Sequence, residues 1–155
     1  RSWTPVVLMS IGAIGSLLLT VAGKDLVGRA RPPASLAVPP LETSPSFPSG
    51  HTLNATVLIG LMAYLLLLHQ ERRASRVATV VTAVVLVVAM GLSRVYLGHH
   101  WLTDVVAAWL LGLGWLAAVI TAHRVQLTLR RQRASSAARP ASSRATGTRN
   151  GEHDT

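Results

Sequence analysis

The sequence contains no cysteine and few charged residues. Without cysteine, neither a disulfide framework nor a cysteine-ligated metal centre can form. Charged residues make up 14% of the 155 residues and hydrophobic residues make up 50%, which argues against an ordinary soluble domain. This balance, with a mean hydropathy of +0.41, favours an integral membrane protein.

Acidic residues are the scarcest charged class, so the formal net charge is +9. A charge of this sign suits nucleic acid, but many of the arginines lie after residue 123, outside any hydrophobic run. The composition there turns to Arg, Ser, Ala, Thr and Gly, which predicts a disordered basic tail over residues 124–155. We expect this tail to meet anionic lipid, and we expect no nucleic-acid partner.

Four hydrophobic runs occupy residues 5–22, 52–68, 77–92 and 101–122. A helix crosses a bilayer with roughly 20 apolar residues, so the third run must continue into Arg94, whose side chain can reach the membrane surface. The length of the runs favours helices over strands. A soluble helical bundle is the alternative, but it needs polar stripes that the third run lacks. We therefore expect an all-α fold, an integral membrane helical bundle.

The runs define a membrane core, residues 1–123, followed by the tail. The sequence starts at Arg1 and not at methionine, so we expect N-terminal helices to be missing from it. If each run crosses the membrane once, one face receives Arg72, Arg73, Arg76 and the tail. The positive-inside rule makes this face cytoplasmic. The ends that join runs one to two and three to four then face outward.

A proline-rich segment separates the first two runs and predicts a loop over residues 23–51. Within it, residues 33–47 would lie beside the outward polar groups. The sequence leaves open whether this part covers a site or selects head groups.

Two histidines and a carboxylate follow the third run. His100 and Asp104 are four residues apart and share a face if a helix opens at Gly98. A carboxylate one turn away can accept the Nδ1–H of the imidazole and leave Nε2 outward as a nucleophile or base. His99 is the competing nucleophile, but its spacing of five to Asp104 fits a helical turn less well.

Positive charges and a helix start would share the same outward face. Lys24, Arg31 and Arg94 lie near the ends of runs and offer cations that suit phosphate. Ser49 and Gly50 precede the second run, where free backbone N–H groups favour an anion. Together these groups predict a pocket for a phosphoryl group.

Phosphoryl transfer also needs a nucleophile on one side of phosphorus and an acid for the leaving oxygen on the other. His100 and His51 can supply this pair at neutral pH. Arg29, two residues before Arg31, is interpreted as an exposed charge outside the site. A metal site among the histidines and Asp104 is the alternative, but no HxH or HExxH pattern supports it.

The order of these residues resembles the three-part signature of the type 2 phosphatidic acid phosphatase family. That family shares its site with vanadium-dependent haloperoxidases and bacterial acid phosphatases. The resemblance covers roughly residues 24–104 and the flanking helices. It is carried by Lys24, six residues, then Arg31-Pro32; by Pro48-Ser49-Gly50-His51; and by Ser93-Arg94, five residues, His100, three residues, then Asp104.

The resemblance implies a role for each residue. His100 would attack phosphorus and form a phosphohistidine, Asp104 would orient it, and His51 would protonate the leaving alkoxide. Members of the family need no metal, and the membrane-bound ones usually have six spanning helices with the signature on the last four. The phosphate ligands would be Lys24, Arg31, Ser49, Gly50 and Arg94.

We therefore expect a membrane lipid phosphate or diphosphate phosphatase without a cofactor. Its site would face outward from a bacterial inner membrane, and its substrate would be an undecaprenyl-type polyprenyl diphosphate, phosphatidic acid or phosphatidylglycerol phosphate. The alternatives are a non-catalytic transporter or anionic-lipid-binding protein, which would not need Asp104 behind His100, and vanadate-dependent halide oxidation. The sequence does not indicate an oligomeric state.

Overall fold

The computed structural model describes residues 3–137, and these residues are helical with connecting loops and no strand. The chain divides into two compact units between Thr121 and Ala122. The elements are α1 (Thr4–Val27), the short 3₁₀ helix η1 (Ala34–Leu36), α2 (Gly50–Leu67), α3 (Arg73–Tyr96) and α4 (Leu102–Ala137). The expected all-α bundle is confirmed.

Each of the four α-helices is long and apolar enough to cross a membrane. Their outward side chains are mostly apolar, as the valines of α3 illustrate: Val81, Val84 and Val85 are all more than half exposed. Hydrocarbon surroundings make such exposure favourable, whereas water would not. The protein is an integral membrane protein, as the composition predicted.

The first helix extends beyond the predicted run. Its first turn contains Pro5, where the missing N–H costs no hydrogen bond. Its last turn contains Lys24, which sequence analysis placed in the loop, and the N–H of Gly28 donates to the carbonyl of Lys24 at 2.9 Å. A cation at a helix C-terminus is stabilised by the helix dipole. Lys24 is therefore attached to a helix and not to a loop.

The prediction of a tail disordered from residue 124 is wrong for residues 124–137, because α4 continues through Ala137. Arg, Leu, Gln and Ala are good helix formers, and a helix that is already nucleated extends through them at little cost. The rest of the predicted tail, 138–155, lies outside the described residues.

The helices of the first unit pack closely around an apolar core. The contact between α3 and α4 depends on Gly91, where a Cβ atom would lie 2.6 Å from the ring of Trp109 and 2.7 Å from Val105. Any larger residue at position 91 would separate these helices. The core cluster comprises Leu8, Leu53, Val57, Leu61, Tyr64, Ala108 and Val119.

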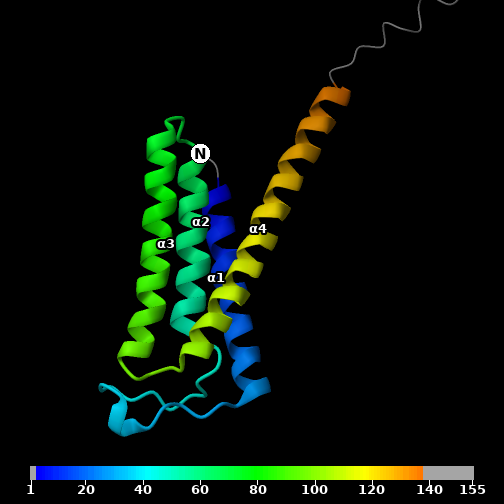
Figure 1. Ribbon diagram of the computed structural model, residues 1–155. Helices are drawn as coiled ribbons and strands as arrows, with labels where there is room; N and C mark the ends of the chain where they lie inside the picture. The colour runs from blue at the N-terminus through cyan, green and yellow to red at the C-terminus, as the bar shows by residue number, and fades with distance from the viewer. Residues whose placement is uncertain (1–2, 138–155) are drawn as a thin grey trace, which may run out of the picture. The chain divides into compact units, whose positions relative to one another are not determined.

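The C-terminal ends of α1 and α3 and the N-terminal ends of α2 and α4 lie at the same end of the bundle (Figure 1). The loop 28–49 crosses this end. Its backbone is attached to the α3–α4 connection, because the N–H of Val38 donates to the carbonyl of Leu97 at 3.0 Å. Two regions that are far apart in sequence, residues 24–51 and 94–104, therefore meet here.

Candidate active site

The turn between α3 and α4 positions the predicted nucleophile. Gly98 has a φ of +70°, and a Cβ atom there would lie 2.2 Å from the carbonyl oxygen of Leu36. Both the left-handed backbone and the close approach of the loop require glycine. The helix opens at Leu102 and not at Gly98, so the prediction that His100 lies on a helical turn is wrong.

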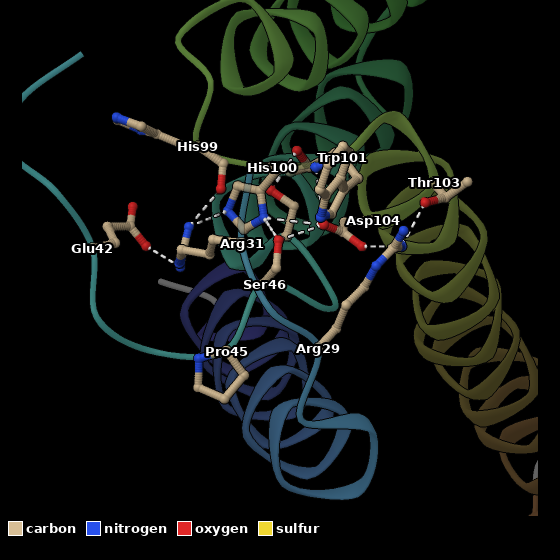
Figure 2. Close-up of polar contacts among 12 residues, drawn as sticks. Arg29, Arg31, Glu42, Pro45, Ser46, His99, His100, Trp101, Thr103 and Asp104 are labelled. Carbon is tan, nitrogen blue, oxygen red and sulfur yellow. Dashed lines mark hydrogen bonds and ion pairs between the residues drawn. The ribbon is translucent and has the colours of Figure 1, made fainter. Parts of the chain in front are cut away.

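The turn nevertheless brings His100 to Asp104. Both residues are buried, at 2% and 0% exposure, and Nδ1 of the imidazole lies 3.7 Å from Oδ2 of the carboxylate. The hydroxyl of Ser46 lies between them: Oγ donates to Oδ2 at 2.5 Å and is 3.4 Å from Nδ1 (Figure 2). Ser46 can thus accept a hydrogen bond from the Nδ1–H while its own O–H donates one to the carboxylate oxygen.

The other nitrogen of the imidazole faces a guanidinium. Nη1 of Arg31 lies 3.5 Å from Nε2 of His100 and donates to the carbonyl of His99 at 2.7 Å. Burial, followed by the positive charge of Arg31, lowers the pKa of His100 to about 4. The imidazole is therefore neutral at pH 7, with Nδ1 held by Ser46 and the Nε2 lone pair directed toward Arg31.

A cavity of about 260 Å³ lies beside this imidazole. Four of the predicted site residues line it: Lys24 from α1, Gly50 and His51 from the start of α2, and His100. The remaining lining residues are Ser16, Leu17, Thr20, Glu42, Ser44 and Asn54. The cavity therefore has one cation, a helix N-terminus and two histidines on its walls, and the guanidinium of Arg31 contacts the lining residues Glu42 and Ser44. Groups of these kinds suit a phosphoryl group.

Groups of the loop hold the cations of the site. Nζ of Lys24 donates to Oγ of Ser44 at 2.9 Å and to the carbonyl of Pro45. Nη2 of Arg31 pairs with Oε2 of Glu42 at 2.5 Å, and the other oxygen of this carboxylate is 4.0 Å from Nδ1 of His51. The loop 28–49 is thus part of the site.

Sequence reasoning missed Glu42. Burial alone would raise the pKa of its carboxyl, but Arg31 and the nearby histidines outweigh burial and hold the pKa below its usual value. The carboxylate is therefore ionised at neutral pH and occupies part of a cavity lined by cations. The one available signal was that Glu42 is the only acidic residue between Gly28 and Ser49.

Three predicted phosphate ligands do not line the cavity. Arg31 lies behind its wall, where it contacts the lining residues Glu42 and Ser44. Ser49 is the N-cap residue of α2, but its hydroxyl lies 3.0 Å from Oγ1 of Thr52 and is buried. The guanidinium of Arg94 contacts Oγ of Ser93 at 3.4 Å, and its backbone carbonyl accepts the N–H groups of His99 and His100. Phosphate contacts from Ser49 and Arg94 stay predictions.

The competing histidine is directed away from the cavity. Nε2 of His99 lies 2.8 Å from the carbonyl of Val38, and its buried Nδ1 has no partner among the described residues. Within residues 3–137, no three His, Asp or Glu side chains are grouped closely enough to hold a metal ion. Of these two adjacent histidines, His100 lines the cavity and His99 does not.

The interpretation of Arg29 as an exposed charge is wrong. Its guanidinium donates to Oδ1 of Asp104 at 2.8 Å and to Oγ1 of Thr103 at 2.6 Å. The charge pattern could not show this, because Arg29 and Asp104 are 75 residues apart and only the tertiary structure brings them together.

Comparisons with known proteins agree with this geometry. A family model described as "PAP2 superfamily" matches residues 5–127. Phosphatidylglycerophosphatase B of Bacillus subtilis (strain 168) is 36% identical over 114 residues, which cover 73% of this chain and 55% of that protein. The crystal structure of a transmembrane PAP2-type phosphatidylglycerolphosphate phosphatase from Bacillus subtilis matches with a TM-score of 0.70 and 34% identity, over 76% of this chain and 58% of that one. The chain thus spans little more than half the length of these relatives.

Proposed function

The chain belongs to the PAP2 superfamily, and on this basis we propose that it is a membrane lipid phosphate or diphosphate phosphatase acting through a phosphohistidine. One observation carries the proposal: a neutral His100 is held at Nδ1, and its Nε2 faces Arg31 beside a cavity lined by Lys24 and His51. Binding an anion would not need a buried carboxylate behind the imidazole, whereas a nucleophile does.

In the first step, Nε2 of His100 attacks phosphorus while the bond from phosphorus to the leaving oxygen breaks. His51 gives its proton to that oxygen, which leaves as a lipid alcohol or lipid monophosphate. As Nε2 loses its lone pair, positive charge develops on the ring, and Asp104 stabilises it through Ser46. In the second step, His51 takes a proton from water, the resulting oxygen attacks phosphorus, and the bond to Nε2 breaks to release phosphate.

Electrostatic stabilisation would come from the cations. Lys24 and Arg31 would neutralise charge on the phosphoryl oxygens, and the N-terminus of α2 at Gly50 would add its backbone N–H groups. The guanidinium of Arg31 forms an ion pair with Glu42, so a bound phosphate would compete with this carboxylate for Arg31. Ser49 and Arg94 complete the proposed ligand set, and their side chains would turn toward the phosphate when it binds.

The substrate class follows from the position of the cavity at the end of four membrane-spanning helices, where lipid head groups lie. The names of the relatives make phosphatidylglycerol phosphate the first candidate. Phosphatidic acid and undecaprenyl-type polyprenyl diphosphate remain candidates from the sequence.

Phosphate release in detergent with EDTA, from all three lipids, tests the proposal. We expect activity that survives EDTA, is lost in His100→Ala and is retained in His99→Ala, the adjacent histidine that serves as a matched control. Both variants should match the wild type in gel filtration and thermal unfolding. An inactive wild-type protein in full-length form, or an active His100→Ala variant, would refute the proposed mechanism.

We further propose that the site faces outward from the bacterial inner membrane and that the opposite end of the bundle is cytoplasmic. The arginines at the start of α3, Arg73 and Arg76, support this orientation through the positive-inside rule. Because the chain has no cysteine, Ala37→Cys in the site loop and Ser75→Cys at the start of α3 give unique labels. An impermeant thiol reagent should label only the first in intact cells, and the reverse pattern would invert the orientation.

A further inference from the structure

Arg29 and Arg31 reach the turn 99–104 from different sides (Figure 2). Arg31 lies on the side of Glu42 and the His99 carbonyl, next to the cavity. Arg29 lies on the side of Thr103 and Asp104. Two guanidiniums separated by one residue therefore meet opposite ends of the His100–Asp104 pair.

The contacts of Arg29 restrict its position. Besides its bonds to Asp104 and Thr103, its guanidinium lies over the ring of Trp101, 5.6 Å from the centroid. The indole N–H of Trp101 donates to the carbonyl of Ala30 at 3.0 Å. Trp101 thus contacts both Arg29 and the following residue, Ala30, and the Arg29 side chain is 38% exposed.

The carboxylate of Asp104 needs this partner. Its side chain is fully buried, and Oδ2 already accepts from the Ser46 hydroxyl at 2.5 Å and from the Trp101 N–H at 3.0 Å. Arg29 is the charged donor that pairs with Oδ1, at 2.8 Å. A buried carboxylate without a counter-charge is costly, and it escapes that cost by protonating or turning away.

We propose that Arg29 is a positioning residue for the reaction: it holds Asp104 ionised and correctly oriented, so that the Asp104–Ser46 pair can hold Nδ1 of His100. The inference rests on the proposed function, because it gives Arg29 a role in the same phosphoryl transfer. The inference also gives the two arginines different roles. Arg31 binds the phosphate, whereas Arg29 acts behind the nucleophile and does not touch the substrate.

Steady-state kinetics of the full-length protein separate these roles. We expect Arg29→Gln to lower kcat by about 10- to 100-fold, as misplacement of a reacting group does, with KM within about twofold of the wild type. Arg29→Lys should recover part of kcat because it keeps the charge. The matched variant Arg31→Gln should raise KM as well as lower kcat, because Arg31 would bind the phosphate itself.

A double-mutant cycle with Asp104→Asn tests whether Arg29 acts through this carboxylate. We expect Arg29→Gln to cause no further loss of kcat in the Asp104→Asn background. Additive losses would show that Arg29 acts independently and would overturn the inference. An Arg29→Gln variant with unchanged kcat, or with a raised KM and unchanged kcat, would also overturn it.

If Arg29→Gln does not fold, Thr103→Val provides a second variant, since it removes one of the two acceptors of Nη1 and leaves the ion pair in place. We expect a fall of severalfold in kcat at constant KM, and an unchanged kcat would count against the inference. These outcomes are distinct from failure of the proposed function, in which the wild type would be inactive or His100→Ala would remain active.

Discussion

The helix α3 and the turn that follows it differ in which side chains they bury: α3 exposes apolar side chains, whereas the turn buries ionisable ones. In α3, Gly91 is the buried residue, while Val84 and Val85 are more than half exposed. In the turn and the first residues of α4, His100 and Asp104 are almost completely buried. Hydrocarbon takes the place of water around α3, so apolar side chains point out, and ionisable groups are stable only where they satisfy one another.

This contrast means that a substitution has a different cost in the two regions. On α3 the expected cost comes from moving a group into lipid. In the turn it comes from breaking a set of bonds among buried polar groups, and the effect should appear in kcat before it appears in stability. Three substitutions test this difference, beginning with the largest expected effect.

Asp104→Asn keeps the shape of the buried side chain and removes its charge. We expect kcat to fall by about 1000-fold, equivalent to roughly 4 kcal/mol of barrier, because an amide cannot compensate the charge that develops on His100. Single-turnover measurement of phosphate release would show the loss. If the free energy of unfolding fell by as much as the activation free energy rose, Asp104 would instead be mainly structural.

Val84→Arg places a charge on the exposed face of α3. In a soluble protein, an exposed substitution of this kind changes stability by about 0.5 kcal/mol or less. In a bilayer we expect a destabilisation of about 3 kcal/mol, with Val84→Leu as the neutral control. Unfolding in lipid nanodiscs measures the difference, and equal stability of the two variants would show that this face does not contact lipid.

Arg31→Gln tests the electrostatics of the turn. The charged groups that act on His100 are Arg31, Glu42 and Asp104. Because the nucleophile must be unprotonated and its pKa is about 4, the acid limb of the pH profile of kcat/KM should lie near pH 4. Loss of the Arg31 charge should raise the pKa of His100 and move this acid limb toward higher pH, though not to 6.5, because burial remains. An acid limb already at 6.5 in the wild type would contradict the buried, neutral His100.

The alternation of spans brings the segments that carry His100, His51 and Lys24 to one end of the bundle, where these residues line one cavity and Asp104 lies beside His100. Their roles in a site stay predictions. Sequence analysis placed the start of α4 four residues early, because spacing alone does not reveal that Gly98 adopts a left-handed backbone. It also missed Ser46 and Glu42. Their contacts depend on how the loop 28–49 folds over the helix ends, which local pattern does not specify.

The sequence by itself determined that the chain is a helical membrane protein, and it identified the candidate residues for phosphate chemistry. Hydrophobic length, charge distribution and motif spacing are local properties that can be read along the chain. Only the tertiary structure decided that Arg29 pairs with Asp104 while Arg31 lies beside Nε2 of His100, and that Ser46 lies between the carboxylate and the imidazole. Hydrogen bonds act over about 3 Å, so a difference of two positions in the chain can place otherwise identical side chains on opposite sides of the nucleophile.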